Sequence, residues 1–357
     1  MALDIGGFLL ARGAVLTFVS SDRARLPVLE KAIRKLNKRI SRMDPNREVV
    51  ATAFWYGDLS PDKVESPDVV LECTSEILEK KKRALVAVLG LLEENTLLIS
   101  NSSSILPDDI HEQCIGVHFF YPVMLKDTVE LILPRDTATR NLSRVRAFLG
   151  EYGLDYVVEH KESAFMVNRL LLPLQAEAIR YLLSGHNPRQ IDEWSASKLL
   201  PFGQLSLLDD IGFDVVDAAL ENYIQRGDGP PARELQPLRD GLRSFITSRK
   251  LGKKNNDGLL TGEGLAKPQN GWVDGNEDSA RKRFLYLFIN GCLKCVERFL
   301  LTEADLTRLL SAALLSEQSF REVLIEEGSD TVQRVLMDFY CLHGRSYFAP
   351  SGLLNYD

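Results

Sequence analysis

Strand-like apolar runs alternate with amphipathic helix-like segments in the first half of the chain, and this alternation restricts the fold more than any other feature. The strand candidates are residues 14–19, 67–73 and 96–100, with a weaker one at 49–53. The helix candidates are residues 2–12, 23–43 and a stretch from Glu76 to about Leu92. Strands that alternate with helices form mostly parallel sheets covered by helices on both faces. The expected fold class is therefore α/β.

Residues 101–130 contain the strongest candidate for a reactive side chain. The apolar run 115–120 is expected to be a buried strand and carries His118 near its end. After the connection Tyr121-Pro122-Val123, a second β-rich run at 128–133 carries Glu130. If the two strands are neighbours, Glu130 can hydrogen-bond one ring nitrogen of His118 and leave the other free to take a proton. A single histidine on an apolar strand is also commonly an ordinary core residue, so both interpretations stay open on these residues alone.

Ligands of α/β sheets bind at the carboxyl ends of the strands. Three polar side chains follow expected strands at that edge: Glu76, Ser103 and His118. The sequence therefore places its candidate site there.

From about Lys161 the pattern changes to helices. They are expected at residues 165–184, from Asn187-Pro188 onward and at 207–225. Residues 282–357 resemble a second copy of this helical unit, because Arg283–Phe288 mirrors Arg169–Leu174. Duplication is favoured over two unrelated bundles. The expected domains are residues 1–160, 161–262 and 282–357, with a polar linker at 263–281.

Composition excludes several classes of protein. A chain of 357 residues suggests two or three domains, and its 45% apolar and 26% charged residues are ordinary for a soluble protein. The net charge of −7 argues against a general nucleic-acid binder. Basic residues gather on one expected helix, where a solvated face is favoured over contact with a phosphate-bearing ligand. They are Arg34, Lys35, Lys38, Arg39 and Arg42.

The five cysteines are odd in number and scattered, which disfavours a disulfide framework. Cys292 and Cys295 form a C-x-x-C inside an apolar helical run, so core packing is favoured over metal or redox chemistry, and no metal site is expected. No apolar run approaches the ~20 residues of a membrane span, and no targeting signal is evident. The expected location is cytoplasmic, with no membrane partner.

Four separated segments together resemble the 3-hydroxyacyl-CoA dehydrogenase family. They are Asn101–Ser104, Gly116–Pro122, Val129–Glu130 and Ser163–Leu171, in the family's order. The twelve-residue step from His118 to Glu130 and the gap to Asn168 also fit. The resemblance covers nearly the whole chain, and its end resembles the tail of the multifunctional fatty-acid oxidation subunits. It implies a doubly wound, Rossmann-like parallel sheet followed by all-α C-terminal domains.

The resemblance also implies the chemistry, which is hydride transfer between C3 of a 3-hydroxyacyl-CoA and NAD. By that likeness His118 is the general base, Glu130 orients it, and Ser103 and Asn168 hold the substrate oxygens. Taken singly, Ser103 could cap a helix, Glu130 could be a strand-surface charge and Asn168 could face solvent. The implied cofactor-binding positions are Ser20, Asp22, Glu76, Lys81 and Asn101.

Two departures from the family pattern concern the cofactor. The family opens with a strand and a G-x-G-x-x-G turn, but here Ala2 stands at the last of those glycines, so the strand and the first two glycines are expected to lie upstream of Met1. The acidic residue that binds the ribose falls on Ser20, and Asp22 comes two positions late. The choice between NAD and its phosphorylated form is therefore open, and NAD binding is in doubt without the Gly-rich loop.

The missing strand is central in such a sheet, so its absence would leave two inner strands with unpaired backbone groups, at about 1–3 kcal/mol for each buried group. Either a longer chain supplies the strand or its two neighbours close up on each other. The expected function is a 3-hydroxyacyl-CoA dehydrogenase. The alternative is a cofactor-deficient homologue that binds acyl-CoA or acts as a scaffold. The expected state is a monomer with an internal pseudo-dimer, or a homodimer through the helical domains.

Overall fold

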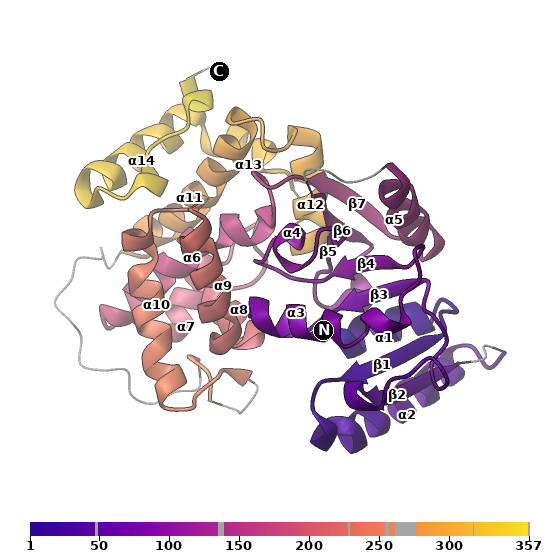
Figure 1. Cartoon of the computed structure of the whole chain (residues 1–357). Coiled ribbons are helices and arrows are strands. Elements are labelled where there is room, and N and C mark those ends of the chain that lie inside the picture. The colour runs from indigo at the N-terminus through magenta and orange to yellow at the C-terminus, as the bar shows by residue number, and fades with distance from the viewer. Residues whose placement is uncertain are drawn as a thin grey trace. The chain divides into compact units, whose positions relative to one another are not determined.

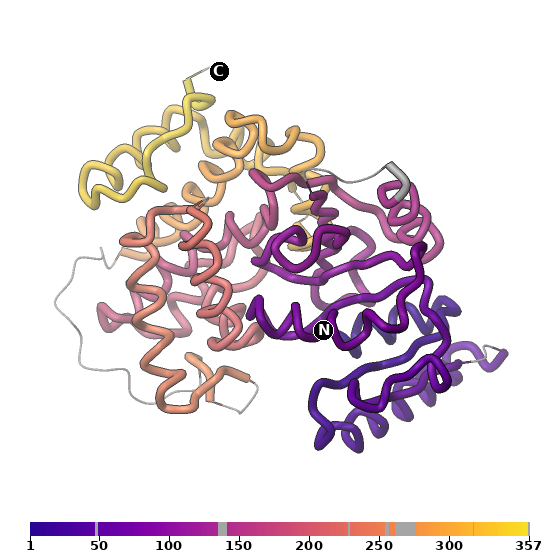
Figure 2. The backbone as a smooth tube through the Cα atoms, viewed as in Figure 1, coloured from indigo at the N-terminus to yellow at the C-terminus, as the bar shows by residue number. Residues whose placement is uncertain are grey.

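The computed structural model describes residues 1–46, 49–134, 139–227, 229–253, 257–260, 276–316 and 318–355, and every structural statement below concerns these residues. The chain divides into two compact units, Met1–Ala164 and Phe165–Asp357. Figure 1 shows that the first unit contains all the described strands and that the second is helical, and Figure 2 traces the backbone through both units. The predicted class, a Rossmann-like α/β domain followed by an all-α region, is confirmed.

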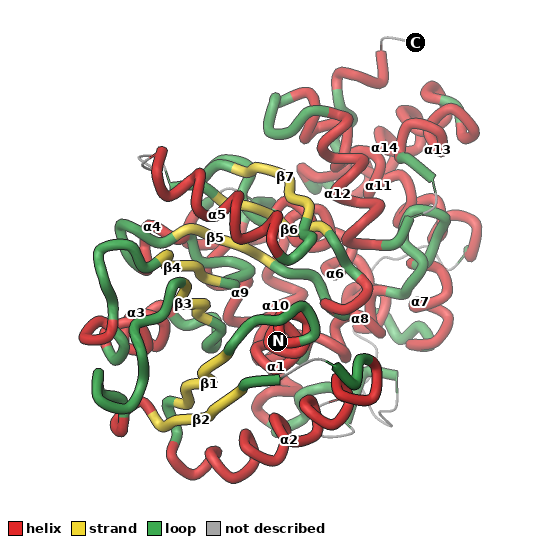
Figure 3. Tube along the Cα trace, turned by 90° about the vertical axis from the view of Figure 1, so that its right-hand side faces the viewer, coloured by secondary structure: helices red, strands yellow, loops and turns green. Residues whose placement is uncertain are grey.

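The strands of the first unit form two separate sheets. One is a parallel pair of β1 (Leu16–Ser20) and β2 (Ala51–Trp55). The other has the order β3-β4-β5-β6-β7. Its strands are β3 (Val69–Glu72), β4 (Leu97–Ser100), β5 (Ile115–His118), β6 (Thr128–Ile132) and β7 (Asp155–Glu159). Figure 3 shows the strands of both sheets in yellow, and no ladder joins β1 to β3.

β5 and β6 are the one antiparallel pair in the described sheets. Only a short connection joins them, and a parallel pair would need a longer crossover. Gly116 allows the two strands to approach, because a Cβ at this position would lie 2.9 Å from Cβ of Ile132. The antiparallel ladder places His118 directly opposite Glu130.

Helices surround the sheets of the first unit. They are α1 (Ala2–Leu10), η1 (Arg23–Arg25), α2 (Leu26–Met43), η2 (Tyr56–Asp58), α3 (Leu78–Val86), η3 (Leu89–Leu91), α4 (Pro107–Ile110), η4 (Val123–Leu125) and α5 (Thr139–Glu151). Side chains of α1 such as Ile5 and Phe8 share one apolar core with Ile99 of β4 and Val117 of β5. Burial of this cluster stabilises the packing of the helices on the sheet, by about 25 cal/mol for each Å² of apolar surface removed from water.

β1 and β3 stand on either side of the place expected for the missing strand, and they do not pair with each other. Of the two alternatives expected for the missing strand, the one in which its neighbours close up on each other is therefore wrong. Helix α1 packs against β1 instead, and Gly6 permits it, because a Cβ there would lie 2.4 Å from the ring of Phe18. The apolar side chains of Leu16 and Val69 pack against the same core as α1.

The second unit consists of helices. They are α6 (Met166–Leu183), α7 (Pro188–Ser195), α8 (Gln204–Ile211), α9 (Phe213–Arg226), α10 (Ala232–Thr247), α11 (Glu277–Glu297), α12 (Glu303–Leu314), α13 (Phe320–Glu327), α14 (Ser329–His343), η6 (Ser346–Phe348) and η7 (Gly352–Asn355). The single helix predicted at 207–225 is wrong. It is interrupted at Gly212, whose φ of +94° is a conformation that glycine adopts readily and an α-helix does not allow. None of the described helices is long and apolar enough to cross a membrane.

A buried ionic cluster joins the two halves of the helical unit. Glu177 of α6 accepts hydrogen bonds from Arg283 of α11 at 3.1 Å, from Arg345 at 2.9 Å and from the Tyr347 hydroxyl at 2.5 Å. Glu177 and Arg283 are fully buried. Helices of residues 165–225 and 283–345 thus pack against each other within one chain, as an internal pseudo-dimer requires. Most of the predicted linker, residues 263–275, lies outside the described residues.

Candidate active site

A histidine–carboxylate pair lies at the carboxyl edge of the five-stranded sheet. His118 ends β5, and its Nδ1 is 2.5 Å from Oε2 of Glu130 on β6. Glu130 is fully buried and His118 is 8% exposed. The ring of Phe120 meets the imidazole edge-on, with ring centroids 5.2 Å apart. The predicted pairing of His118 with Glu130 is confirmed as geometry.

The contact fixes the tautomer of the imidazole. A carboxylate can only accept a hydrogen bond, so Nδ1 of His118 carries the proton that Glu130 accepts. In the neutral ring Nε2 is then the unprotonated nitrogen. This is the form in which a histidine acts as a base, and the nearby carboxylate stabilises the imidazolium that results.

The segment after β4 folds around Glu76. The hydroxyls of Ser102 and Ser104 donate to one carboxylate oxygen of Glu76 at 2.7 and 2.8 Å, and the backbone N–H of Ser103 donates to the other at 3.1 Å. Glu76 therefore organises the loop that carries the predicted substrate-binding residue Ser103. The roles of Ser102 and Ser104 were not predicted, although the run of three serines, 102–104, marked the loop.

A second buried carboxylate lies directly beneath this loop. Glu72 of β3 accepts hydrogen bonds from Lys81 at 2.9 Å, from Ser100 at 2.7 Å and from the Thr74 hydroxyl at 2.5 Å. Burial opposes ionisation of Glu72, but the charge of Lys81 and these hydrogen bonds outweigh it and hold the pKa of Glu72 below its ordinary value. No sequence pattern marked Glu72 beyond its place at the end of an expected strand.

Lys81, a predicted cofactor ligand, is fully enclosed in the first unit. Its ammonium group donates to Glu72 and to the carbonyl of Thr74, and lies 3.7 Å from Glu76. In this arrangement it supports the two carboxylates of the edge, and direct contact with a cofactor stays a prediction.

Asn101, also predicted near the cofactor, ties two strands together. Its side-chain oxygen accepts a hydrogen bond of 2.9 Å from the backbone N–H of Phe119. Because Asn101 follows β4 and Phe119 follows β5, this bond aligns the serine loop with His118.

The other predicted cofactor residues, Ser20 and Asp22, lie at the carboxyl end of β1. They form a local turn in which the Ser20 hydroxyl donates to the carbonyl of Asp22 at 2.9 Å. The Asp22 carboxylate caps η1 by accepting from the backbone N–H of Ala24, also at 2.9 Å. No carboxylate thus stands at the strand end itself.

Asn168 lies in the first turn of α6, in the helical unit, and is half-buried. Its role in holding a substrate oxygen stays a prediction.

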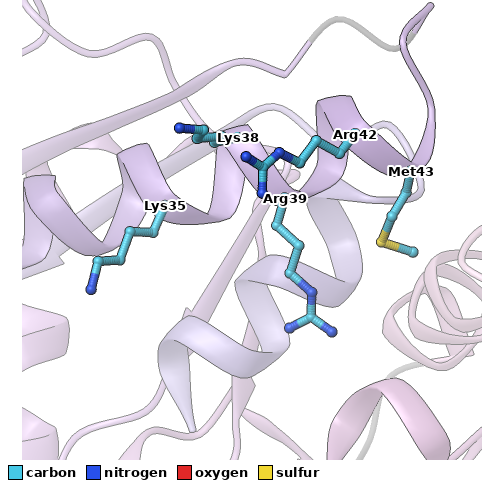
Figure 4. Close-up of a pocket in the computed structure, with 5 residues that line it drawn as sticks. All are labelled: Lys35, Lys38, Arg39, Arg42 and Met43. Carbon is cyan, nitrogen blue, oxygen red and sulfur yellow. The ribbon is translucent and has the colours of Figure 1, made fainter.

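The basic residues singled out in the sequence lie along one exposed face of α2, opposite the buried Ile33 and Ile40. Figure 4 shows the residues of this helix that line a pocket. Its lining residues are Lys35, Lys38, Arg39, Arg42 and Met43. Cys292 and Cys295 are buried in α11, and burial raises the pKa of Cys292 well above its ordinary value. Inert packing suits such a thiol.

The Rossmann-like sheet, the close packing of α1 on β1 at Gly6 and the histidine–glutamate pair at the carboxyl edge fit a dinucleotide-dependent oxidoreductase. Comparison with known proteins narrows this class. The family model of the 3-hydroxyacyl-CoA dehydrogenase NAD binding domain matches residues 1–163, and that of the C-terminal domain of the same family matches residues 165–262. The chain belongs to the 3-hydroxyacyl-CoA dehydrogenase family, whose members are NAD-dependent enzymes.

Individual relatives agree with this assignment. A fatty acid oxidation complex subunit alpha from Idiomarina loihiensis is 28% identical over 277 residues, which are 71% of this chain and 38% of that protein. The chain thus spans well under half the length of this curated relative. The structure of 3-hydroxybutyryl-CoA dehydrogenase from Escherichia coli K12 matches with a TM-score of 0.73 at 19% identity. The match covers 99% of this chain and 95% of that chain.

The dehydrogenase part of multifunctional enzyme 1 from C. elegans also matches. Its TM-score is 0.59 at 18% identity, with coverage of 99% of this chain and 86% of that chain. At these identities the solved structures show the shared fold, including the helical C-terminal region.

Proposed function

We propose that this chain carries the catalytic site of a 3-hydroxyacyl-CoA dehydrogenase, with His118 as the general base. The observation that carries the proposal is the contact between His118 and Glu130 at the carboxyl edge of the sheet, where ligands of this fold bind. A core histidine would need no buried carboxylate to hold its Nδ1, and burying Glu130 has a desolvation cost that a purely structural role does not explain.

In the proposed reaction Nε2 of His118 takes the proton of the substrate 3-hydroxyl group. Glu130 holds the ring in place and stabilises the imidazolium, and in the reverse direction the same nitrogen returns the proton. Ser103 and Asn168 are the proposed donors to the substrate oxygens. Their hydrogen bonds strengthen as negative charge develops on the oxygen, which lowers the barrier to hydride transfer.

The nicotinamide cofactor accepts the hydride in the oxidation direction. Among the described residues, α1 is the helix that would approach its pyrophosphate, and Glu76 and Asn101 shape the loop at the edge of the sheet where its nicotinamide end is proposed to lie. The residues fit a dinucleotide at this edge. They fit NAD less well at the ribose end, where Ser20 replaces the acidic residue.

One observation favours the alternative, a cofactor-deficient homologue that keeps acyl-CoA binding or a scaffold role. The sheet is interrupted between β1 and β3, at the centre of the expected dinucleotide site. In that case acyl-CoA would bind without turnover, and the helical unit would serve as the scaffold.

The two functions are separated by assay with acetoacetyl-CoA, run at cofactor concentrations high enough to offset the weak cofactor binding expected of this chain. An enzyme consumes a reduced nicotinamide cofactor in the presence of acetoacetyl-CoA, followed by absorbance at 340 nm, and shows no such consumption with butyryl-CoA, which lacks the 3-keto group. A scaffold binds both thioesters in calorimetry and consumes no cofactor with either.

A further inference from the structure

The turn that follows β1 holds two guanidinium groups where a carboxylate is expected. Ser20 ends the strand, and Arg23 and Arg25 lie in the 3-10 helix η1 directly after it. Both arginines are exposed. In Rossmann folds the end of this strand selects the cofactor, because an acidic residue accepts hydrogen bonds from the ribose hydroxyls and repels a phosphate there, whereas an arginine accommodates the 2′-phosphate.

Arg23 is held over an aromatic surface at this edge. Its guanidinium carbon lies 5.3 Å from the ring centroid of Trp55, the residue that pairs with Ser20 in the β1–β2 ladder. The ring of Tyr56 lies 5.4 Å from that of Trp55. Such stacking orders the arginine while leaving its N–H groups available, which is the arrangement that suits recognition of a phosphate.

The nearby carboxylate does not cancel these charges. Asp22 accepts from the backbone N–H of Ala24 at 2.9 Å and lies 3.7 Å from Nε of Arg25. The Asp22 carboxylate is thus engaged within the turn. Two arginines and one aspartate leave the turn with a net charge of about +1. The Ser20 hydroxyl is also engaged inside the turn and brings no charge to the strand end.

We infer that the adenosine subsite at the carboxyl end of β1 takes a 2′-phosphorylated ribose, so that the cofactor of this chain is NADP rather than NAD. The inference rests on the proposed dehydrogenase function and changes its cofactor. Arg23 and Arg25 bind the 2′-phosphate, and Ser20 matters because it places no negative charge beside it.

The test uses adenosine fragments, because they probe this subsite without the rest of the cofactor site. The affinities of adenosine 2′,5′-bisphosphate, adenosine 3′,5′-bisphosphate and 5′-AMP for the full chain are measured by calorimetry at about physiological salt, which screens nonspecific attraction to the exposed basic face of α2. The 3′,5′ isomer has the same charge and differs only in the position of one phosphate. The 2′,5′ isomer should bind at least about tenfold more tightly than either comparison compound.

Substitutions then assign the effect to the turn. The double variant Arg23→Gln/Arg25→Gln should lose the preference, and Ser20→Asp should reverse it toward 5′-AMP. Arg42→Gln removes one positive charge from the far end of α2 and should leave the preference unchanged. All four sites are at the surface or half-buried, and circular dichroism checks that each variant folds.

Equal binding of the two bisphosphates, tighter binding of 5′-AMP or no detectable binding of the 2′,5′ isomer at millimolar concentration would each overturn the inference. Turnover with acetoacetyl-CoA is a separate readout. Turnover with NADH in a chain that has no 2′-phosphate preference keeps the proposed function and rejects this inference. A clear preference for the 2′-phosphate without turnover keeps the 2′-phosphate site and rejects the proposed dehydrogenase function.

Discussion

His118 and Glu130 face each other as directly paired residues of two antiparallel strands, with Nδ1 and Oε2 2.5 Å apart. A ladder of backbone hydrogen bonds, and no flexible loop, therefore sets the distance between the proposed base and the group that orients it. Buried strands of this kind hold catalytic groups more precisely than loops do. The first prediction follows from this rigidity.

His118→Gln should lower kcat by ~10²–10⁴, the usual contribution of a general base, and should leave the affinity for acyl-CoA largely unchanged. Glu130→Gln should cost less, because an amide still holds the ring but does not stabilise the imidazolium. His160→Gln, at an exposed histidine of the same unit, is the matched control and should have no effect. Undiminished kcat in His118→Gln would reject the assignment.

The pair Glu72–Lys81 should be important for the stability of the first unit. Lys81→Met leaves Glu72 buried without its counter-charge and should lower the free energy of unfolding by about 3–5 kcal/mol. The double variant with Glu72→Gln should recover much of this loss, and Lys82→Met on the exposed side of α3 should change little. Urea denaturation measures all three. Equal losses in Lys81→Met and Lys82→Met would contradict the argument.

The pKa of Glu72 predicts the direction of a pH effect. Because its pKa is lower in the folded chain than in the unfolded chain, the carboxylate stabilises the fold above its unfolded value of about 4.5, and this contribution is lost as the pH falls through the folded value. Glu72→Gln should therefore reduce the slope of stability against pH below about pH 4. A slope identical to that of the unsubstituted chain would be inconsistent with this role.

His343 predicts a second pH effect in the helical unit. Burial and the charges of Arg283 and Arg345 lower its pKa to about 4, and its Nε2 accepts a hydrogen bond from Arg283 at 2.9 Å. The unfolded chain protonates this histidine near pH 6.5, so its stabilising effect is complete above that value and declines as the pH falls toward about 4. Allowing for its partial exposure, the loss should be about 1–2 kcal/mol.

Thermal unfolding between pH 4 and 7 measures this contribution, with His343→Gln as the comparison. The substituted chain should lose less stability between pH 6.5 and 4 than the unsubstituted one. Parallel pH profiles of the two chains would show that the histidine does not titrate as described.

The packing of α6 on α11 predicts the behaviour of a shortened chain. A chain that ends near residue 270 lacks α11 and should expose apolar residues of α6 together with the buried carboxylate Glu177. Exposed apolar surface of this kind favours self-association, so light scattering should detect dimers or larger species. The full chain should be a monomer or a weak dimer. A shortened chain that is monomeric and fully folded would refute the internal pseudo-dimer.

Much of this site could be predicted from the sequence. The apolar runs placed His118 and Glu130 on two strands that were open to pairing, and the serine run marked the loop after β4. The break at Gly212 was missed because the apolar period continues across it, and only the backbone conformation separates α8 from α9. The partnership of Glu72 with Lys81 was missed because it joins the end of a strand to a helix nine residues later, a contact that no helical or strand period predicts. Propensity does not encode such tertiary contacts.

The interruption between β1 and β3 gives the most direct test of the central claim, that the His118 site is a dehydrogenase site completed by a strand and a Gly-rich turn. Residues 1–357 include no G-x-G turn before α1 to bring backbone close to a pyrophosphate. Losing two or three contacts of ~1–3 kcal/mol each moves a micromolar Kd toward millimolar or beyond. Calorimetric titration with NADH, and with NADPH in parallel, should therefore show very weak binding.

The same titration on a chain extended before Met1 by an apolar strand and a G-x-G turn should show micromolar binding of a reduced cofactor. That chain should also reduce acetoacetyl-CoA, and His118→Gln should abolish the turnover. Micromolar NADH binding by the 357-residue chain, or an extended chain that binds the cofactor and does not turn over, would contradict the account.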